Sequence, residues 1–304
     1  DNTKLAYGID TLSRRVYSIK VKDLTTGKML NDEISGVSSF AVWAADSSTM
    51  FYTSKDEETL RTNRIFRHQL GQSQDRDTMV FEEKDETFYT FVYPSKSREY
   101  IMIGSTSTLT SEYQFLPSNT PQGTFKTIQK RKRGMEYSVA HFDDSFYIST
   151  NANNSTNFKL VKAPVSAPDI SNWEDVIPHR NDVLLEGVEL FRDFMVVAER
   201  QNGLLQLRVM RWDGKEEYYL DFDSEAYTAS LSTNPEFDSD VFRYNYSSLT
   251  TPSSVIDFDT KTKTKEVKKE QEVLGGAFDK KNYTSERLWA IADDGTKIPI
   301  SLVR

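Results

Sequence analysis

A short apolar strand pattern recurs six times along this chain at nearly constant spacing, and this recurrence limits the possible folds more than any other feature. The six segments are rich in aromatic and aliphatic residues and are flanked by turn-forming residues. They begin at residues 5, 51, 100, 146, 195 and 241, so successive starts are 46 to 49 residues apart. Self-similarity at a fixed period is typical of folds built from repeated units.

A second strand pattern follows each of these segments within about ten to twenty residues, which places a hairpin in every repeat. Clear cases are Arg64–His68, Phe158–Val161 and Leu205–Val209. A sheet of about four strands needs roughly 40 to 50 residues, the size of one propeller blade. Helical repeats of this length would place apolar residues three and four apart, and no long stretch does so. The sequence therefore predicts an all-β fold, a β-propeller with about six blades' worth of strands.

Length and aromatic content agree with this prediction. A chain of 304 residues is long enough for two ordinary domains, but large all-β units are often single, and the repeat favours one main unit. The 18 Phe and 15 Tyr are far more than a disordered chain would carry. They suit thin sheets that pack through large rings.

Charge and cysteine content exclude several classes of function. The formal net charge of -8 would repel nucleic acids and anionic membranes, so neither is expected as a partner. The chain has no cysteine, which excludes disulfides, thiolate metal sites and a cysteine nucleophile and suits a reducing cytoplasm. The apolar runs are shorter than the ~20 residues that cross a bilayer, and Asp1–Lys4 lacks a signal-peptide pattern. We expect a soluble cytoplasmic protein.

Three segments outside the repeated strands carry local structural signals. Residues Lys261–Lys269 alternate Thr and Lys, as an exposed edge strand would, because lysines discourage unwanted strand pairing. Residues Pro164–Ser171 are rich in Ala, Pro and Ser, and we expect them to form a surface connection between blades. A last hairpin is expected from Glu286–Ala292 and Lys297–Val303 across the turn Asp293–Gly295.

The motifs of the commonest hydrolases and nucleotide-binding proteins are missing. No Gly-x-Ser-x-Gly nucleophile turn occurs, since Gly36–Phe40 and Gly71–Asp75 both lack the second glycine. No phosphate-binding Gly-x-x-x-x-Gly-Lys-Ser/Thr loop occurs either. The sequence pairs none of the three histidines with a nucleophile, so we interpret each as structural, and we predict no metal and no cofactor. These histidines are His68, His141 and His179.

Two charged runs have both a functional and a structural interpretation. The basic run Lys130–Arg133 would suit nuclear import or an acidic partner, but a solvated loop is favoured because the whole chain is acidic. The acidic run Glu82–Glu86 contains paired carboxylates, which glycosidases use at a fixed separation. Since the sequence fixes no separation, a surface loop is the favoured interpretation there as well.

Several longer stretches carry a family resemblance, and they occur in colinear order from near residue 3 to Arg304. They are Arg14–Ile19, Val21–Leu24, Val42–Asp46, Phe51–Thr53, Arg67–Gly71, Phe81–Asp85, Leu185–Gly187, Ala198–Gln201, Arg243–Pro252 and Asn282–Trp289. These stretches resemble the prolyl oligopeptidase family of serine peptidases, and within it the oligopeptidase B (protease II) group. Their order makes the resemblance more specific than any single motif.

The resemblance implies a fold and a domain organisation. Members of this family pair a seven-bladed propeller with an α/β-hydrolase domain that carries a Ser/Asp/His triad. It implies that residues 1–278 are the propeller, without its first blade, and that residues 279–304 are a linker and the first hairpin of the catalytic domain. The family's Gly-x-Ser-x-Gly turn lies beyond this hairpin, so no catalytic residue is assigned, and this part alone is expected to be inactive. We expect an open sheet edge that promotes association.

The resemblance also implies a function and partners. The propeller would admit short peptides to a peptidase that cuts after Arg or Lys, exclude folded proteins and support the catalytic domain of the same polypeptide. Acidic residues near the entrance would attract such cationic peptides. Arg14 and Arg15 are candidates for charged contacts with the catalytic domain, and a solvated turn is the alternative. The alternative for the whole chain is a stand-alone propeller that binds protein partners without catalysis.

Overall fold

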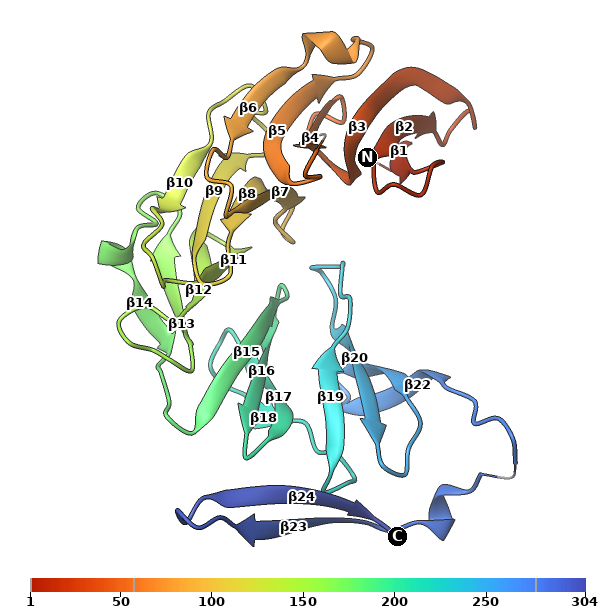
Figure 1. Cartoon of the computed structure of the whole chain (residues 1–304), viewed down its shortest axis with the longest axis vertical. Helices are drawn as coiled ribbons and strands as arrows, with labels where there is room; N and C mark the ends of the chain where they lie inside the picture. Colours follow the sequence, from red (N-terminus) through yellow and green to blue (C-terminus); the bar gives the residue numbers. More distant parts are fainter. Residues whose placement is uncertain (1, 57, 277) are drawn as a thin grey trace. The chain divides into compact units, whose positions relative to one another are not determined.

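The computed structural model describes residues 2–56, 58–276 and 278–304, and these residues fold into antiparallel strands with three short 3-10 turns (Figure 1). The chain divides into two compact units: unit 1 comprises residues 1–152 and 162–174, and unit 2 comprises residues 153–161 and 175–304. No helix in the described residues is long and apolar enough to cross a membrane. The prediction of an all-β chain is confirmed.

The first two sheets lie in unit 1, and in each of them consecutive strands are neighbours. The six-stranded sheet consists of β1 (Lys4–Ile9), β2 (Tyr17–Asp23), β3 (Met29–Trp43), β4 (Thr49–Lys55), β5 (Thr62–Gln69) and β6 (Thr78–Glu82). The turn η1 (Gln74–Arg76) precedes β6. The next sheet consists of β7 (Tyr89–Pro94), β8 (Tyr100–Thr106), β9 (Ser111–Pro117) and β10 (Lys126–Gln129).

The later sheets repeat the four-stranded pattern. The boundary between the units falls within the third sheet, which consists of β11 (Tyr137–Phe142), β12 (Ser145–Thr150), β13 (Lys159–Pro164) and β14 (Glu174–Ile177), with η2 (Ile170–Asn172) before β14. Unit 2 holds β15 (Val183–Leu190), β16 (Phe194–Gln201), β17 (Leu204–Arg211) and β18 (Glu217–Tyr219) in one sheet. It also holds β19 (Tyr227–Leu231), β20 (Val241–Ser248), β21 (Ser254–Asp259) and β22 (Thr264–Glu270), then η3 (Lys280–Asn282) and the hairpin of β23 (Ser285–Ile291) and β24 (Lys297–Val303).

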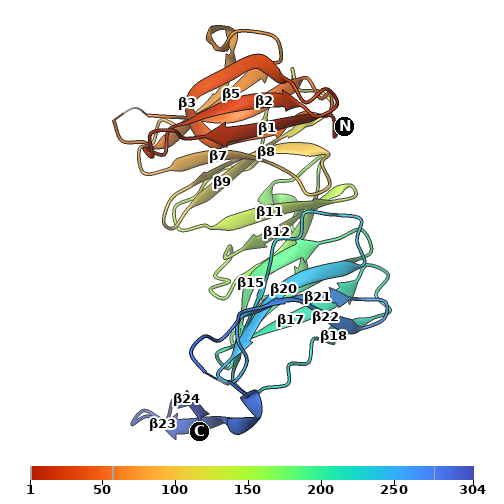
Figure 2. The same cartoon turned by 90° about the vertical axis from the view of Figure 1, so that its right-hand side faces the viewer.

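The long strand β3 joins two repeats into the six-stranded sheet. Its first half, Met29–Ser35, pairs with β2, and its second half, Val37–Trp43, pairs with β4. Gly36 lies between the halves with a φ of 75°, a conformation that a side chain disfavours. One strand therefore ends the first repeat and begins the second, and Figure 2 shows β1, β2 and β3 side by side.

The recurring apolar segments are the second strands of their repeats. The five later segments lie in β4, β8, β12, β16 and β20, each the second strand of its repeat when the second half of β3 is counted as a first strand. In β16 the six consecutive residues Phe194–Glu199 are all buried. Because successive side chains point to opposite faces, such a run shows that both faces of the strand are covered. This double burial explains why these strands dominate the sequence pattern.

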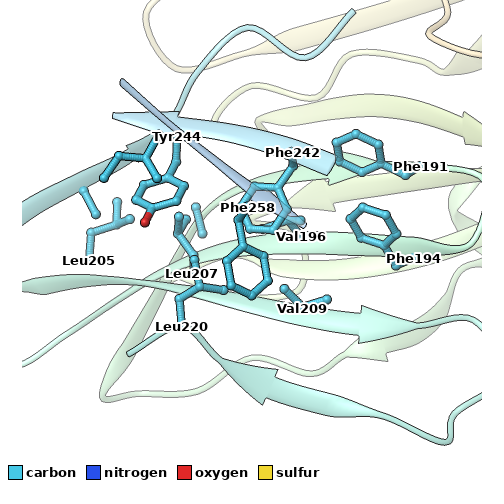
Figure 3. Packing of buried hydrophobic residues seen from close by; sticks show 13 residues of the cluster. Phe191, Phe194, Val196, Leu205, Leu207, Val209, Leu220, Phe242, Tyr244 and Phe258 are labelled. Atoms are coloured by element: carbon cyan, nitrogen blue, oxygen red, sulfur yellow. The ribbon is translucent and has the colours of Figure 1, made fainter. Parts of the chain in front are cut away.

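The core of unit 2 lies between the faces of its two four-stranded sheets. Phe191 and Phe194 stack with ring centroids 4.5 Å apart, and the rings of Phe242 and Phe258 are 5.4 Å apart (Figure 3). Aliphatic residues of β16 and β17, such as Leu207, fill the space between the rings. Phenylalanine thus supplies much of the contact between sheets, as the aromatic content predicted.

The outer strands and connections test two further predictions. All residues of β22 are exposed at the edge of its sheet, so the edge strand predicted within Lys261–Lys269 is confirmed. The hairpins predicted at Arg64–His68 and Leu205–Val209 are also confirmed, as β4–β5 and β16–β17. The assignment of Pro164–Ser171 to a connection between blades is wrong, because this segment joins β13 and β14 of one sheet.

We predict that Phe242→Ala destabilises unit 2 by about 3–5 kcal/mol, because the fully buried ring would leave a cavity among Phe194, Tyr244 and Phe258. Denaturant unfolding followed by fluorescence measures the loss. Phe40→Ala is the matched control, since Phe40 is 55% exposed, and it should change stability by less than about 0.5 kcal/mol. Equal losses in the two variants would contradict the assignment of the core.

Candidate domain interface

Successive strands of each four-stranded sheet run in opposite directions, so two kinds of loop lie at the same end of every sheet. One is the turn between the second and third strands, and the other is the connection to the next sheet. We call this end the connection end. Buried carboxylates lie at this end in both units, Glu83 in unit 1 and Glu199 in unit 2.

In unit 1, two arginines fix the connection between β6 and β7. Arg131 Nη2 donates to Glu83 Oε2 at 2.5 Å, and its guanidinium lies 4.0 Å from the centre of the Phe88 ring. Arg61 Nη1 donates to the carbonyl oxygens of Asp85 and Phe88 at 3.1 and 2.9 Å. Arg131 belongs to the basic run Lys130–Arg133, so this member of the run is an internal ion-pair partner, whereas the other three are exposed.

Arg14 and Arg15 lie in the turn between β1 and β2, also at the connection end of their sheet, and both are exposed. The amide of Arg15 donates to Asp10 Oδ2 at 2.6 Å, and Lys55 Nζ donates to the carbonyl oxygen of Arg15. Arg15 has a φ of 58°, a left-handed conformation that these contacts hold. The turn therefore has a fixed backbone and presents the exposed side chains of Arg14 and Arg15 to solvent.

In unit 2, a buried carboxylate organises the connection end. Glu199 of β16 is fully buried and accepts hydrogen bonds from Arg180, from Arg208 Nη2 at 2.5 Å and from the Tyr219 hydroxyl at 2.7 Å. Arg208 Nη1 also donates to Glu217 Oε1 at 2.9 Å. We call these five residues the Glu199 network. It ties the connection before β15 to β16, β17 and β18.

The Glu199 network keeps its groups in defined ionisation states. Burial raises the pKa of Tyr219, and the neighbouring Glu199 carboxylate raises it further, so the phenol stays protonated and donates. Burial alone would disfavour the charge of Arg180, but Tyr219 and Glu199 outweigh it and raise the pKa of Arg180. The sequence held one signal for this site, because Glu199 follows five apolar residues of a buried strand and a buried charge needs partners.

We predict that Glu199→Gln destabilises unit 2 by about 3–5 kcal/mol, because removing one partner of a buried ion pair leaves uncompensated charge. Denaturant unfolding measures the effect. Glu186→Gln is the control on the same sheet, since the Glu186–Arg200 pair is partly exposed, and it should cost less than about 1 kcal/mol. A loss at Glu199 as small as at Glu186 would show that the network adds little to folding.

The hairpin β23–β24 contacts the connection end of unit 2 (Figures 1 and 2). Arg287 Nη2 donates to the carbonyl oxygen of Asn202 in the β16–β17 turn. The amide nitrogen of Arg287 donates to Glu225 Oε2 at 3.2 Å, in the connection between β18 and β19. A cavity of about 720 Å³ remains here, lined by Asn202, Gly203, Trp289, Lys297 and Pro299.

The structure places two of the three histidines in hydrogen-bonded clusters that the sequence did not indicate. His141 is buried, and its Nδ1 lies 2.8 Å from Ser97 Oγ, so a hydroxyl does accompany this histidine. Its Nε2 atom is buried and has no hydrogen-bond partner among the residues that the structure describes, whereas a catalytic triad needs a carboxylate on the second nitrogen. His179 lies in the connection between β14 and β15. Across the described residues, no group of three or more His, Asp or Glu has the arrangement of a metal site.

His68 lies between two buried carboxylates at the other end of its sheet. Its Nδ1 is 2.7 Å from Asp77 Oδ1 and its Nε2 is 3.2 Å from Asp32 Oδ1, while the Tyr52 hydroxyl donates to Asp77 Oδ2 at 2.8 Å. Burial alone would lower the pKa of His68, but Asp77 and Asp32 outweigh it and raise that pKa above the ordinary value. The cluster joins β3, β4, β5 and the residue before β6, which makes it a structural tie within one sheet.

The raised pKa of His68 predicts that unit 1 loses stability as the pH rises. The folded state holds its proton more tightly than the unfolded state, so this stabilisation is complete below the unfolded value of about 6.5 and disappears as the pH passes the folded pKa. Urea midpoints measured at increasing pH for the native chain and for His68→Gln check this. The difference between them should shrink with rising pH, whereas His179→Gln controls for the loss of a histidine; a constant difference would contradict a charged His68.

Comparison with known proteins gives a consistent result. The family described as "Prolyl oligopeptidase, N-terminal beta-propeller domain" matches residues 1–271. The chain is 43% identical over 304 residues to dipeptidyl aminopeptidase BI of Pseudoxanthomonas mexicana and 31% identical to Protease 2 of Moraxella lacunata. All of the chain is covered in both cases, but only 42% and 43% of the relatives. The chain thus spans less than half of their length.

Solved structures agree in fold. Oligopeptidase B from Leishmania major superposes with a TM-score of 0.87 at 31% identity, over 99% of this chain and 43% of that one. Oligopeptidase B from Trypanosoma brucei, in a closed form with covalently bound antipain, gives a TM-score of 0.85 at 32% identity, over 99% and 43% of the two chains. The sheets of this chain are therefore the blades of a β-propeller.

Proposed function

Because the chain belongs to the prolyl oligopeptidase family and forms its N-terminal β-propeller domain, we propose that it controls substrate access in a serine peptidase that cuts short peptides after Arg or Lys. The observation that carries this proposal is the family match over residues 1–271 together with two oligopeptidase B structures at more than 30% identity. The catalytic Ser/Asp/His triad would lie in another part of the polypeptide. Since the chain has no cysteine, a cytoplasmic location remains part of the proposal.

The hairpin β23–β24 supports a domain division near residue 278. The family match stops before it, and residues 279–304 would be the linker and the first strands of the α/β-hydrolase domain. One face of the hairpin is apolar and 37 to 47% exposed at Leu288, Ile298, Ile300 and Leu302. An isolated two-stranded sheet is only marginally stable in water, so this face needs a cover. The proposed catalytic domain would provide it.

The distribution of charge supports a preference for cationic peptides. The net charge is -8, and Asp221, Asp223 and Glu225 are exposed in the connection between β18 and β19. Equivalent loops of all blades share one face of a propeller, so these carboxylates would border the proposed catalytic domain. They would raise the local concentration of peptides that contain Arg or Lys.

Arg14 and Arg15 remain our candidates for contacts with that domain. Their turn lies at the connection end of its sheet, and its backbone is held by Asp10 and Lys55. Two exposed guanidinium groups on a fixed turn are suited to bidentate pairing with carboxylates. This placement is the reason to prefer an interface over a solvated turn.

A second activity has specific support in the relative that is 43% identical, which is a dipeptidyl aminopeptidase. Such an enzyme would remove dipeptides from a free N-terminus and would not need Arg or Lys. A stand-alone interaction propeller without catalysis is the third possibility.

We predict that the full-length polypeptide hydrolyses short peptides after Arg or Lys, whether or not their N-terminus is blocked, and leaves folded proteins intact. The measurement is kcat/KM for a matched set of blocked and free peptides, short and long, at low and high salt. Capture of basic peptides should weaken at high salt because exposed carboxylates are screened. Activity limited to free N-termini would indicate the dipeptidyl aminopeptidase, and a full-length product without peptidase activity would favour the interaction propeller.

A further inference from the structure

The hairpin β23–β24 presents two different faces, and only one of them meets the propeller. Strand register places Arg287 opposite Ser301 and Trp289 opposite Pro299 on one face. Trp289 and Pro299 line the cavity at the Asn202–Gly203 turn, so this is the face toward the β15–β18 sheet. The other face is the apolar one described above. Arg287 is thus the central charged residue of the propeller-facing side.

Arg287 joins the hairpin to two separate loops. Its guanidinium donates to the Asn202 carbonyl and its amide nitrogen donates to Glu225, so one residue contacts both the β16–β17 turn and the connection between the two sheets of unit 2. The turn is a tight two-residue hairpin loop, in which Asn202 and Gly203 have φ values of 52° and 79°. A side chain at Gly203 would place its Cβ 3.3 Å from Arg287 Nη2, which is tighter than an ordinary contact.

In the described part of the chain, Arg287 makes the hydrogen bonds that join the hairpin to other loops of unit 2. The connection between β22 and β23 is exposed at all of its described residues, 271–276 and 278–284. A cavity of about 720 Å³ separates part of the hairpin from the turn, so packing there is incomplete. The position of the hairpin therefore depends strongly on the Arg287 contact.

The Arg287 contact is also built to release. The Arg287 guanidinium donates to a neutral acceptor, the carbonyl oxygen of Asn202. The Nε atom of Arg287 is buried and has no partner in the described part of the chain. The guanidinium also lies 5.0 Å from the centre of the Trp289 ring of the same hairpin. By contrast, Arg180 and Arg208 of the same unit are bound to a buried carboxylate.

We infer that Arg287 is a positioning residue that holds the catalytic domain closed on the propeller and thereby sets the size of peptide that is admitted. The inference rests on the proposed function, since it requires that the hairpin begin the catalytic domain. Loss of the contact would free the exposed connection to bend and would shift the enzyme toward an open arrangement. Loss of one charge-assisted hydrogen bond corresponds to a shift of about tenfold in that equilibrium.

The test compares Arg287→Met, Arg287→Lys and Glu225→Gln in the full-length polypeptide. Arg192→Met is the matched control, because Arg192 is a partly exposed arginine with an ion pair to Asp238 and lies in the turn at the opposite end of β16. Two quantities are measured. One is the rate of limited proteolysis within residues 271–284, and the other is the ratio of kcat/KM for a long unstructured peptide to that for a tetrapeptide with the same cleavage site.

Arg287→Met should raise both quantities about tenfold. Arg287→Lys should raise both quantities less than Arg287→Met does, because the ammonium still donates one hydrogen bond. Glu225→Gln should also raise them less, and it changes the same contact at an exposed residue. Arg192→Met should match the native enzyme. Native values in Arg287→Met, or equal changes in Arg192→Met, would overturn the inference. If the native polypeptide cleaves no peptide, the proposed function fails, and the proteolysis rates alone still decide whether Arg287 holds the hairpin.

Discussion

Packing of one twisted sheet against the next is the constraint on which the rest of this structure depends. A four-stranded sheet with two apolar faces cannot be stable alone, and only a neighbour on each side covers both. The second strand of each repeat is the one most covered on both faces, and in β16 six consecutive residues are buried. Aromatic rings such as Phe194 and Phe242 fill the space between sheets, so the fold needs many of them and few aliphatic runs.

The same packing determines where charge can lie. Because sheet faces are apolar, polar groups are confined to strand ends and loops unless they are fully paired. Among the paired clusters of the described residues, those around Glu199 and His68 each lie within one sheet. Each links several strands of one sheet, and removing a single partner would leave a buried charge without compensation. These clusters therefore favour one strand arrangement over others.

The sequence predicted those features that follow from periodicity and local chemistry. The second strands are apolar because both of their faces are buried, and their regular spacing predicted the repeated sheets. The alternation of Lys and Thr predicted the edge strand β22. The sequence could not predict pairings between distant residues. Arg131 and Glu83 are 48 positions apart, and Ser97 and His141 are 44 apart, so their partners depend on how neighbouring sheets pack. The composition of residues 164–171 suits a loop within a sheet as well as one between sheets. For this reason the sequence did not show that this loop joins β13 and β14.

The arginine contacts within unit 2 are of two kinds, which differ in how firmly they hold their partners. A guanidinium bound to a buried carboxylate, such as Arg208 with Glu199, separates only at a large desolvation cost, so the strands that it joins act as one body. A guanidinium bound to a neutral backbone carbonyl, such as Arg287 with Asn202, separates at a lower cost, which is that of one charge-assisted hydrogen bond. The β16–β17 hairpin carries both kinds of contact, because Glu199 lies only three residues before Asn202. A stable sheet thus carries a weaker contact at its tip, at the β16–β17 turn.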